Sequence, residues 1–321
     1  MILTVTLNPL LEHRFAYNVL HLGKENRGAK QFYKAGGKGI NISRQLNFLS
    51  IDNLAFTFLG GNNGKLLKKL LAEENINFTS ILTHSDTRSS AIIIDESARS
   101  ITSCFGNNPA ITSLECEEFK SKLEKMIQNC EIVVFSGSSP CEETNSIIPF
   151  GIEIANQYDK ISVCDTYGTH LYDCIKASPT IIHNNLTEVE KTLRIALSSE
   201  NEIIAHLKFL QSNNVKQSFL TDAANSSYAS NFDFIYKVNN PKINTIDSTG
   251  SGDAFTAGII YAWHHNHPFE EALILASSLG VMNASKFDVC NVTINEIEQI
   301  RNSIEVIPLG KKMRIVDVNP M

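Results

Sequence analysis

Short apolar runs alternate with helix-length segments along most of the chain. Residues 65–74 and 113–129 carry apolar side chains at helical spacing. In the second segment the apolar stripe is Phe119, Leu123, Met126, Ile127 and Cys130. The runs that predict strands are 1–7, 52–60, 132–135, 161–164, 180–182 and 215–220. Continuous apolar strands joined by helices are typical of a parallel sheet covered on both faces, so the pattern predicts an α/β fold.

Two regions interrupt this alternation. Residues 13–34 and 88–105 carry β-type patterns, and 91–95 with 100–102 predict the strands of a hairpin. Together the two regions predict a small β lid inserted in the main domain, which would suit chemistry that excludes water. Residues 227–238 predict a β meander at one edge of the main sheet.

Composition and charge narrow the classes of partner. The 321 residues contain 28 Lys and Arg against 34 Asp and Glu, a formal net charge of −6. This field does not favour nucleic acid or an anionic membrane, so we expect neither as a partner. Seven scattered cysteines without a Cys-x-x-Cys pair predict reduced thiols. Because we see neither a signal peptide nor a membrane-length apolar run, we expect a cytoplasmic protein.

The most specific stretch is residues 246–258. Gly250 and Gly252 permit a tight turn whose amides can face one anion, and the apolar residues 254–263 predict a buried helix directly after it. Asp253 would lie in the first helical turn, where a carboxylate beside an anion hole could accept a hydroxyl proton. The alternative is an ordinary glycine-rich helix start with Asp253 as a capping residue, and spacing alone does not separate the two.

At these residues the chain resembles the ribokinase-like sugar kinases of the phosphofructokinase-B family. Its Asp-Ser-Thr-Gly-Ser-Gly-Asp at 247–253 is similar to the family signature Asp-Thr-x-Gly-Ala-Gly-Asp. Gly-Gly-Lys-Gly-Ile-Asn at 36–41 resembles the sugar-side loop, and Thr-Leu-Asn-Pro at 6–9 resembles the branch of 1-phosphofructokinases and tagatose-6-phosphate kinases. The matches run in order over about residues 1–308.

This resemblance implies a fold and a set of substrate contacts. The fold is a three-layer α/β/α sandwich with a mostly parallel central sheet, in a single domain over residues 1–321, with lid segments at about 10–34 and 88–106. Asp253 would be the catalytic base, and the amides of Gly250, Ser251 and Gly252 would form the anion hole. Arg88 and Ser138 would hold the phosphate already on the substrate, although an isolated Arg is more often a solvated surface charge. The implied substrate-binding residues are Glu12, Arg27, Gly37, Lys38, Gly39, Asn41, Arg88 and Ser138, with Arg27 supplied from a partner subunit's lid.

The resemblance also implies ATP and Mg²⁺. Asn185 and Glu188 match the Asn-x-x-Glu that organises the metal through water, although the same residues suit a helix N-terminus. Such lids pair into a dimer clasp, so a homodimer is expected. The implied nucleotide-binding residues are Asn185, Thr221, Ala223, Ser226, Thr249 and Asn283.

Three departures from the family pattern leave alternatives open. Glu12 stands where Asp is usual, His183 replaces a lysine at a strand end, and the turn 221–226 lacks two glycines. We interpret the chain as a magnesium-dependent kinase that transfers phosphate from ATP in line to a phosphorylated ketohexose, of the fructose 1-phosphate or tagatose 6-phosphate type. The alternatives are a kinase of another sugar or a nucleoside, and a non-catalytic sugar-phosphate-binding protein.

Overall fold

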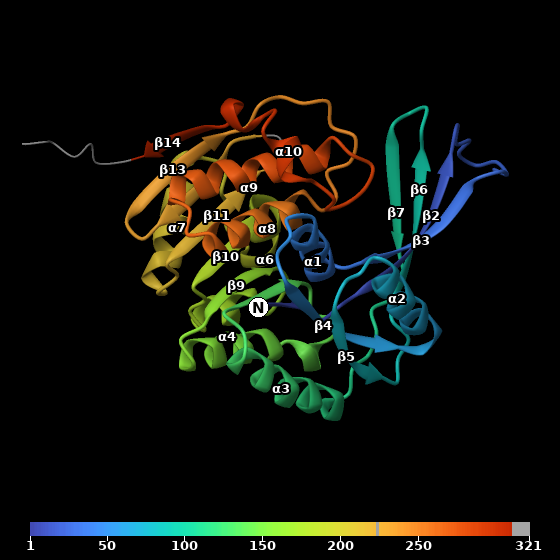
Figure 1. The fold of residues 1–321 in the computed structure, drawn as a ribbon, viewed down its shortest axis with the longest axis horizontal. Helices are drawn as coiled ribbons and strands as arrows, with labels where there is room; N and C mark the ends of the chain where they lie inside the picture. Colours follow the sequence, from blue (N-terminus) through green and yellow to red (C-terminus); the bar gives the residue numbers. More distant parts are fainter. Residues whose placement is uncertain (223–224, 310–321) are drawn as a thin grey trace, which may run out of the picture.

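A ten-stranded sheet forms the centre of the molecule (Figure 1). The computed structural model describes residues 1–222 and 225–309. The strands from β11 to β5 are parallel, and β12, β13 and β14 add an antiparallel edge. This confirms the mostly parallel sheet. In spatial order the strands are β14 (Glu305–Leu309), β13 (Phe234–Asn239), β12 (Ser227–Asn231), β11 (Gln217–Thr221), β10 (Ile181–Asn185), β9 (Ile161–Thr166), β8 (Ile132–Gly137), β1 (Ile2–Thr6), β4 (Asn53–Gly60) and β5 (Phe78–Thr83).

Helices cover both faces of this sheet, because its strands alternate apolar side chains between two cores. Ala55 of β4 packs with Ile40 and Leu67, whereas the next residue, Phe56, packs against Phe119 on the opposite face. The first face carries α1 (Lys38–Phe48), α2 (Gly61–Glu73), α8 (Ser251–His264), α9 (Phe269–Ala284) and α10 (Ile294–Ile297). The second carries α3 (Ser113–Gln128), α4 (Ile147–Gln157), α5 (Leu171–Lys176), α6 (Leu186–Leu193) and α7 (Glu200–Ser212). The short helices η1 (Glu142–Thr144) and η2 (Arg301–Ser303) complete the described elements, and the three-layer fold class is confirmed.

A second, four-stranded sheet stands beside this body (Figure 1). Its order is β3 (Lys30–Gly36), β2 (Leu10–Tyr17), β6 (Ser89–Asp95) and β7 (Ser100–Phe105). The central pair β2 and β6 is parallel and joins two segments distant in sequence. These strands lie in the segments expected for the lid, except that β3 continues to Gly36. Its action as a lid stays a prediction.

The structure corrects one local expectation and adds one strand that the sequence did not predict. Helix α2 begins at Gly61, four residues before the predicted start, and Gly61 has a φ of 61°, with Asp86 occupying the place of a side chain. Strand β14 is absent from the sequence-based assignment because Pro308 interrupts its short apolar pattern. An edge position tolerates that proline, since one side of the strand makes no ladder hydrogen bonds. None of the helices in residues 1–222 and 225–309 has the length and apolarity to cross a membrane.

Candidate active site

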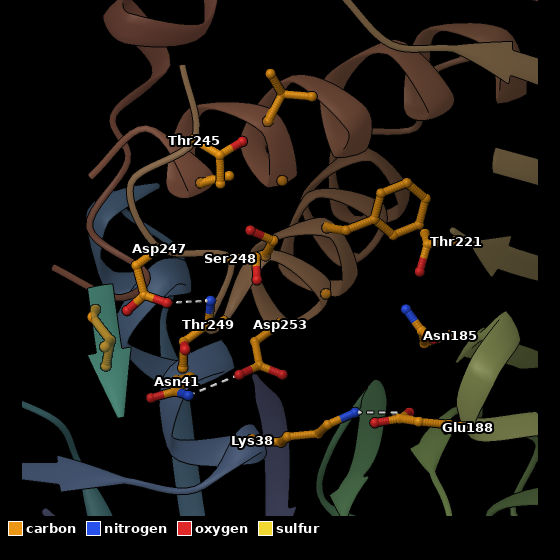
Figure 2. Close-up of a pocket in the computed structure, with 18 of the residues that line it drawn as sticks. Lys38, Asn41, Asn185, Glu188, Thr221, Thr245, Asp247, Ser248, Thr249 and Asp253 are labelled. Carbon is orange, nitrogen blue, oxygen red and sulfur yellow. Dashed lines mark hydrogen bonds and ion pairs between the residues drawn. The ribbon is translucent and has the colours of Figure 1, made fainter. Parts of the chain in front are cut away.

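A cavity of about 1040 Å³ lies at the carboxyl ends of the parallel strands, between the main body and the second sheet. Asn185 and Thr221 line it from the ends of β10 and β11, and Ile92 and Phe105 line it from the second sheet. The N-terminal turns of α1 and α8 supply its polar centre (Figure 2). Open α/β sheets bind ligands at this edge, because the loops that leave the strands meet there.

The N-terminus of α8 has the form of an anion hole. Gly250 has a φ of 77°, and a Cβ there would lie 2.2 Å from Val289 Cγ1, so only glycine fits. The N–H groups of Gly252 and Asp253 make no hydrogen bond within the described part of the chain. Gly250, Ser251, Gly252 and Asp253 all line the cavity. Unpartnered amides at the positive end of a helix dipole are suited to a phosphoryl group.

Asp253 lies in the first turn of this helix and is buried, with 4% of its surface exposed. Its Oδ2 accepts a hydrogen bond of 2.7 Å from Asn41 Nδ2 (Figure 2). Burial raises the pKa of Asp253 to about 7, and the charge of Lys38 opposes this shift. A carboxyl group that titrates near neutrality can take up a proton in the reaction and release it afterwards.

A buried charge network adjoins Asp253. Lys38 Nζ lies 3.3 Å from Asp165 Oδ1 and 3.4 Å from Glu188 Oε2. Burial opposes the charge of Lys38, but these carboxylates and Asp253 hold its pKa above the usual value. His183 Nδ1 lies 3.4 Å from Asp165 Oδ1 and 3.0 Å from the Thr256 hydroxyl. Asp165 had no predicted role, although its position at the carboxyl end of a parallel strand is the signal for one.

Glu12 lines the cavity from β2 and is fixed by a residue that the sequence did not single out. Arg14 Nε and Nη2 donate to Glu12 Oε2 at 2.8 and 2.7 Å. Both residues are buried, and both line the cavity. The longer Glu side chain therefore comes with a neighbouring Arg that compensates its charge.

Arg88 lies at a polar corner of the cavity. Its guanidinium donates to the backbone oxygens of Asn8 and Pro9 and to Asn108 Oδ1, at 3.1, 3.4 and 3.3 Å. Asn8 in turn donates to Asn108 Oδ1 at 3.0 Å and to Ser138 Oγ at 3.1 Å, so Arg88 and Ser138 share one network. Among the described residues no carboxylate pairs with Arg88. A half-buried cation without a carboxylate partner suits an anionic ligand.

Three predicted sugar-side residues, Arg27, Gly39 and Ser138, do not line the cavity, although Ser138 is linked to Arg88 through Asn8. The Arg27 side chain is 87% exposed and pairs with Glu25 at 2.7 Å. Gly39 packs against β1, where an added Cβ would lie 2.4 Å from Thr6 Oγ1. Gly37, Lys38 and Asn41, in contrast, line the cavity.

The predicted nucleotide-side residues are also divided. Thr221 and Thr249 line the cavity, and the Thr221 hydroxyl lies 3.2 Å from His183 Nε2. Asn185 caps α6 by accepting from Thr187 N at 2.9 Å, and Figure 2 shows its amide nitrogen directed into the cavity. Glu188 faces the cavity and pairs with Lys38.

Asn283 and Ser226 are turned toward other parts of the protein. Asn283 donates to Thr249 O at 2.8 Å and accepts from Cys290 N at 2.7 Å, so it supports the turn before α8. Ser226 Oγ donates to Asn239 Oδ1 at 2.7 Å. Ala223 lies outside the described residues.

A model of the pfkB family of carbohydrate kinases matches residues 13–296. The chain belongs to this family. This confirms the family that the sequence motifs predicted, and with it the enzyme class, a phosphotransferase with an alcohol group as acceptor. ATP is the phosphate donor that the family implies.

Known relatives of this kinase cover nearly its whole length. It is 28% identical over 310 residues to a tagatose-6-phosphate kinase of Staphylococcus epidermidis, an alignment that covers 96% of this chain and 99% of the relative. The structure of a protein described as a possible 1-phosphofructokinase from Thermotoga maritima superposes with a TM-score of 0.89 at 21% identity, covering 97% and 100% of the two chains. Phosphofructokinase-2 of Escherichia coli in complex with fructose-6-phosphate superposes with a TM-score of 0.82 at 19% identity, covering 94% and 98%.

Proposed function

We propose that this kinase transfers the terminal phosphoryl group of ATP to a hydroxyl of a phosphorylated ketohexose, of the fructose 1-phosphate or tagatose 6-phosphate type. One observation carries the proposal. Asp253, with a pKa raised to about 7 by burial, stands beside the unpartnered amides of Gly252 and Asp253 in the cavity. A base next to an anion hole is what in-line phosphoryl transfer requires.

Each group at the centre of the cavity has a part in this reaction. Asp253 accepts the proton of the attacking hydroxyl, and the amides of Gly250 and Gly252 hold the phosphoryl group while charge develops on it. The Ser251 N–H, also predicted for this role, instead donates to Ser248 O at 3.1 Å and braces the turn. Lys38, kept protonated by its carboxylate neighbours, supplies a fixed positive charge between the two substrates. Asn41 holds the carboxylate of Asp253 in place.

We infer that the substrate carries a phosphate, because the guanidinium of Arg88 is placed to bind one. Its guanidinium is held by backbone oxygens and by Asn108, and Ser138 belongs to the same network. The planar fork of Arg matches two phosphate oxygens. The names of the tagatose-6-phosphate and phosphofructokinase relatives support the same substrate class.

Mg²⁺ would be held next to the donor phosphates by Asn185 and Glu188 through water, where it neutralises phosphate charge. These residues suit an indirect site, because Glu188 faces the cavity and already shares one oxygen with Lys38. No group of three or more His, Cys, Asp or Glu side chains among the described residues could hold a metal alone. Hydrated Mg²⁺ commonly takes few protein ligands beside substrate phosphates.

The test is release of ADP with Mg²⁺ and ATP against fructose 1-phosphate, tagatose 6-phosphate, fructose 6-phosphate and the unphosphorylated ketoses. Asp253→Asn keeps the size of the side chain and removes the base, so we expect turnover to fall by about 10³-fold or more. Turnover on one phosphorylated ketose that disappears in Asp253→Asn supports the proposal. Turnover retained in Asp253→Asn contradicts the role of the base.

The same assay separates the alternatives. Turnover on an unphosphorylated sugar or a nucleoside would identify a different kinase. Sugar-phosphate binding without Mg²⁺-dependent ATP affinity would identify a binding protein. We place the reaction in the cytoplasm, where ATP and sugar phosphates occur together.

We also propose that two copies associate through the second sheet. Phe32, Tyr33 and Phe105 are 43%, 44% and 63% exposed on its outer strands. Exposed aromatic side chains on the edge strands of a sheet favour association. Light scattering should give the mass of a dimer, and the triple change Phe32→Ser, Tyr33→Ser and Phe105→Ser should give that of a monomer. A monomeric parent protein would contradict this assembly.

A further inference from the structure

Asn41 lies between the proposed base and a buried arginine. Its Nδ2 donates to Asp253 Oδ2 at 2.7 Å, and its Oδ1 accepts from Arg44 Nη1 at 2.7 Å. A guanidinium carries donors alone, so the atom of Asn41 that faces it must be the oxygen. The amide nitrogen must then face Asp253. The orientation of the Asn41 amide is therefore set by Arg44.

Arg44 is itself firmly held. It is 5% exposed and lies three residues after Asn41 on α1, on the same face of the helix. Its Nε donates to Glu74, and its Nη2 donates to the backbone oxygen of Ala35. Arg44 does not line the cavity, whereas Asn41 and Asp253 do. Asn41 is therefore the residue that joins Arg44 to Asp253 by hydrogen bonds.

We propose that Arg44 is a positioning residue for the base: by fixing the amide of Asn41, it keeps a donor on Asp253 Oδ2 and leaves Oδ1 for the proton of the substrate hydroxyl. This inference rests on the proposed role of Asp253. The hydrogen bond also stabilises the ionised carboxylate, the form that accepts a proton. Without Arg44 the amide can turn, and its oxygen would then face the carboxylate and disfavour ionisation.

Other charged and titratable groups surround this chain of contacts and stay in place when Arg44 is changed. Lys38, Asp165, His183 and Cys290 act on or lie near Asp253. Glu74, Lys34 and Asp288 are near Arg44. A change confined to the amide of Asn41 is therefore distinguishable from a general change of charge by a double-mutant cycle.

The experiment measures the pH dependence of kcat/KM in Arg44→Met, Asn41→Ala and the double variant. Loss of the donor should move the acidic limb of the profile upward by about one pH unit in either single variant. Because both changes break the same bond, the double variant should shift no further. Arg44→Lys, which keeps a cationic donor, should recover part of the shift.

Arg301→Met is the matched control. Like Arg44, Arg301 is paired with acidic side chains, here Glu271 and Glu298, and does not line the cavity, but no hydrogen bond among the described residues joins it to Asn41. Arg301→Met should lower the melting temperature and leave the pH profile of kcat/KM unchanged. If Arg44→Met behaves in the same way, Arg44 is merely structural and the inference is wrong. Additive shifts in the double variant would likewise exclude a route through Asn41.

The inference remains testable if the proposed function fails. Should the parent protein turn over none of the sugars, the titration of Asp253 can be followed by its carboxyl stretch in infrared difference spectra, assigned with Asp253→Asn. An upward shift in Arg44→Met that is absent from Arg301→Met would support the inference without any catalysis. An unchanged titration would overturn it.

Discussion

The two walls of the cavity differ in how their polar side chains are satisfied. On the wall that we propose for the sugar, formed by Glu12, Lys38 and Asn41 and called the sugar wall, each of these three side chains has a partner within the protein. On the wall that we propose for the nucleotide, formed by residues 240–249 and Ser277 and called the nucleotide wall, residues 240–249 are exposed or half-buried. Asn240 Oδ1 and Ser277 Oγ are buried there without a hydrogen-bond partner in the described residues.

This difference indicates where preorganisation is needed. The groups near Asp253 must hold one geometry while a proton and a phosphoryl group move, and their mutual bonds supply that geometry. The nucleotide wall has to accept and release a large ligand, so it retains polar atoms that a ligand can satisfy. Changes on the first wall should affect turnover or sugar binding, and changes on the second should affect nucleotide affinity.

Apart from removal of the base itself, the largest expected effect is at Gly250, in the turn that follows the nucleotide wall. Gly250→Ala places a Cβ against Val289 at a φ of 77°. We expect turnover to fall by about 10²–10³-fold, because the anion hole is displaced, and the free energy of unfolding to fall by about 1–3 kcal/mol. Steady-state kinetics and urea unfolding measure the two effects.

The control for this change is Gly168→Ala. Gly168 also has a positive φ, 103°, but an added Cβ would meet no atom nearer than 3.7 Å, and Gly168 does not line the cavity. The Gly168→Ala variant should be less stable than the parent protein and should keep the turnover of the parent. Equal loss of turnover in both variants would mean that backbone strain, rather than displacement of the anion hole, explains the effect.

Arg88→Ala should separate the two walls most clearly. Removal of a charged donor from a phosphate costs about 1.5–3 kcal/mol, so we expect KM for the sugar phosphate to rise by about 10²-fold. KM for ATP should change less than about twofold, because Arg88 lies on the sugar side. Initial rates at varied concentrations of both substrates give these values. An equal rise in both would contradict the division into two walls.

The raised pKa of Asp253 also predicts an effect on the free energy of unfolding. Burial raises its pKa from 3.8 to about 7, so the folded state holds this proton more tightly than the unfolded state. The stability contributed by the group is therefore present below pH 4 and is lost as the pH rises through 7. Asp253→Asn should be more stable than the parent protein at pH 8, by on the order of 1–3 kcal/mol, and similar to it at pH 4.

Urea unfolding at both pH values measures this difference. Asp95 provides a control of opposite sign, because hydrogen bonds from Ala98 and Ser97 lower the pKa of its carboxyl group. Asp95→Asn should destabilise the protein at pH 8. A stability gain for Asp253→Asn that did not depend on pH would show that titration of this carboxyl is not its source.

A smaller effect is expected at Glu12. Glu12→Asp shortens the side chain and breaks the two bonds from Arg14, leaving a buried cation without its partner. We expect KM for the sugar phosphate to rise by about tenfold. The pair change Glu12→Gln with Arg14→Met should be better folded than Glu12→Gln alone, as thermal unfolding would show. The opposite order would mean that Arg14 does not depend on Glu12.

The sequence predicts the frame of this molecule better than its contacts. Buried parallel strands carry continuous apolar runs, so β4 and β8 were located within a few residues. Strand β14 was not predicted because it lies at an edge of the sheet, where a proline and half-exposed positions obscure the apolar pattern. The start of α2 was placed four residues too late because Gly61 and Gly64 are poor helix formers.

The site residues show the same difference between local sequence signals and tertiary contacts. Asp253 and Gly250 could be located because a glycine-rich turn before a buried helix is a local signal. Arg14 and Arg44 could not, because an isolated Arg is usually exposed and only tertiary contacts show that these two are buried. Asn283 illustrates the opposite case, since the family resemblance implied a nucleotide contact while its bonds hold the turn before α8.

The smallest expected effect is at Ser277, and it tests the nucleotide wall directly. Its hydroxyl is buried, lines the cavity and has no partner in the described residues, so the protein without ligand loses nothing when it is removed. Ser277→Ala should leave the melting temperature equal or higher, because an unsatisfied hydroxyl is costly to bury. If a nucleotide supplies the missing partner, KM for ATP should rise by about fivefold while KM for the sugar phosphate stays constant.

The equivalent removal on the sugar wall, Asn41→Ala, should lower both stability and turnover, since there the partner is already present. Loss of stability in Ser277→Ala would place its hydroxyl with the satisfied groups and remove the contrast between the two walls.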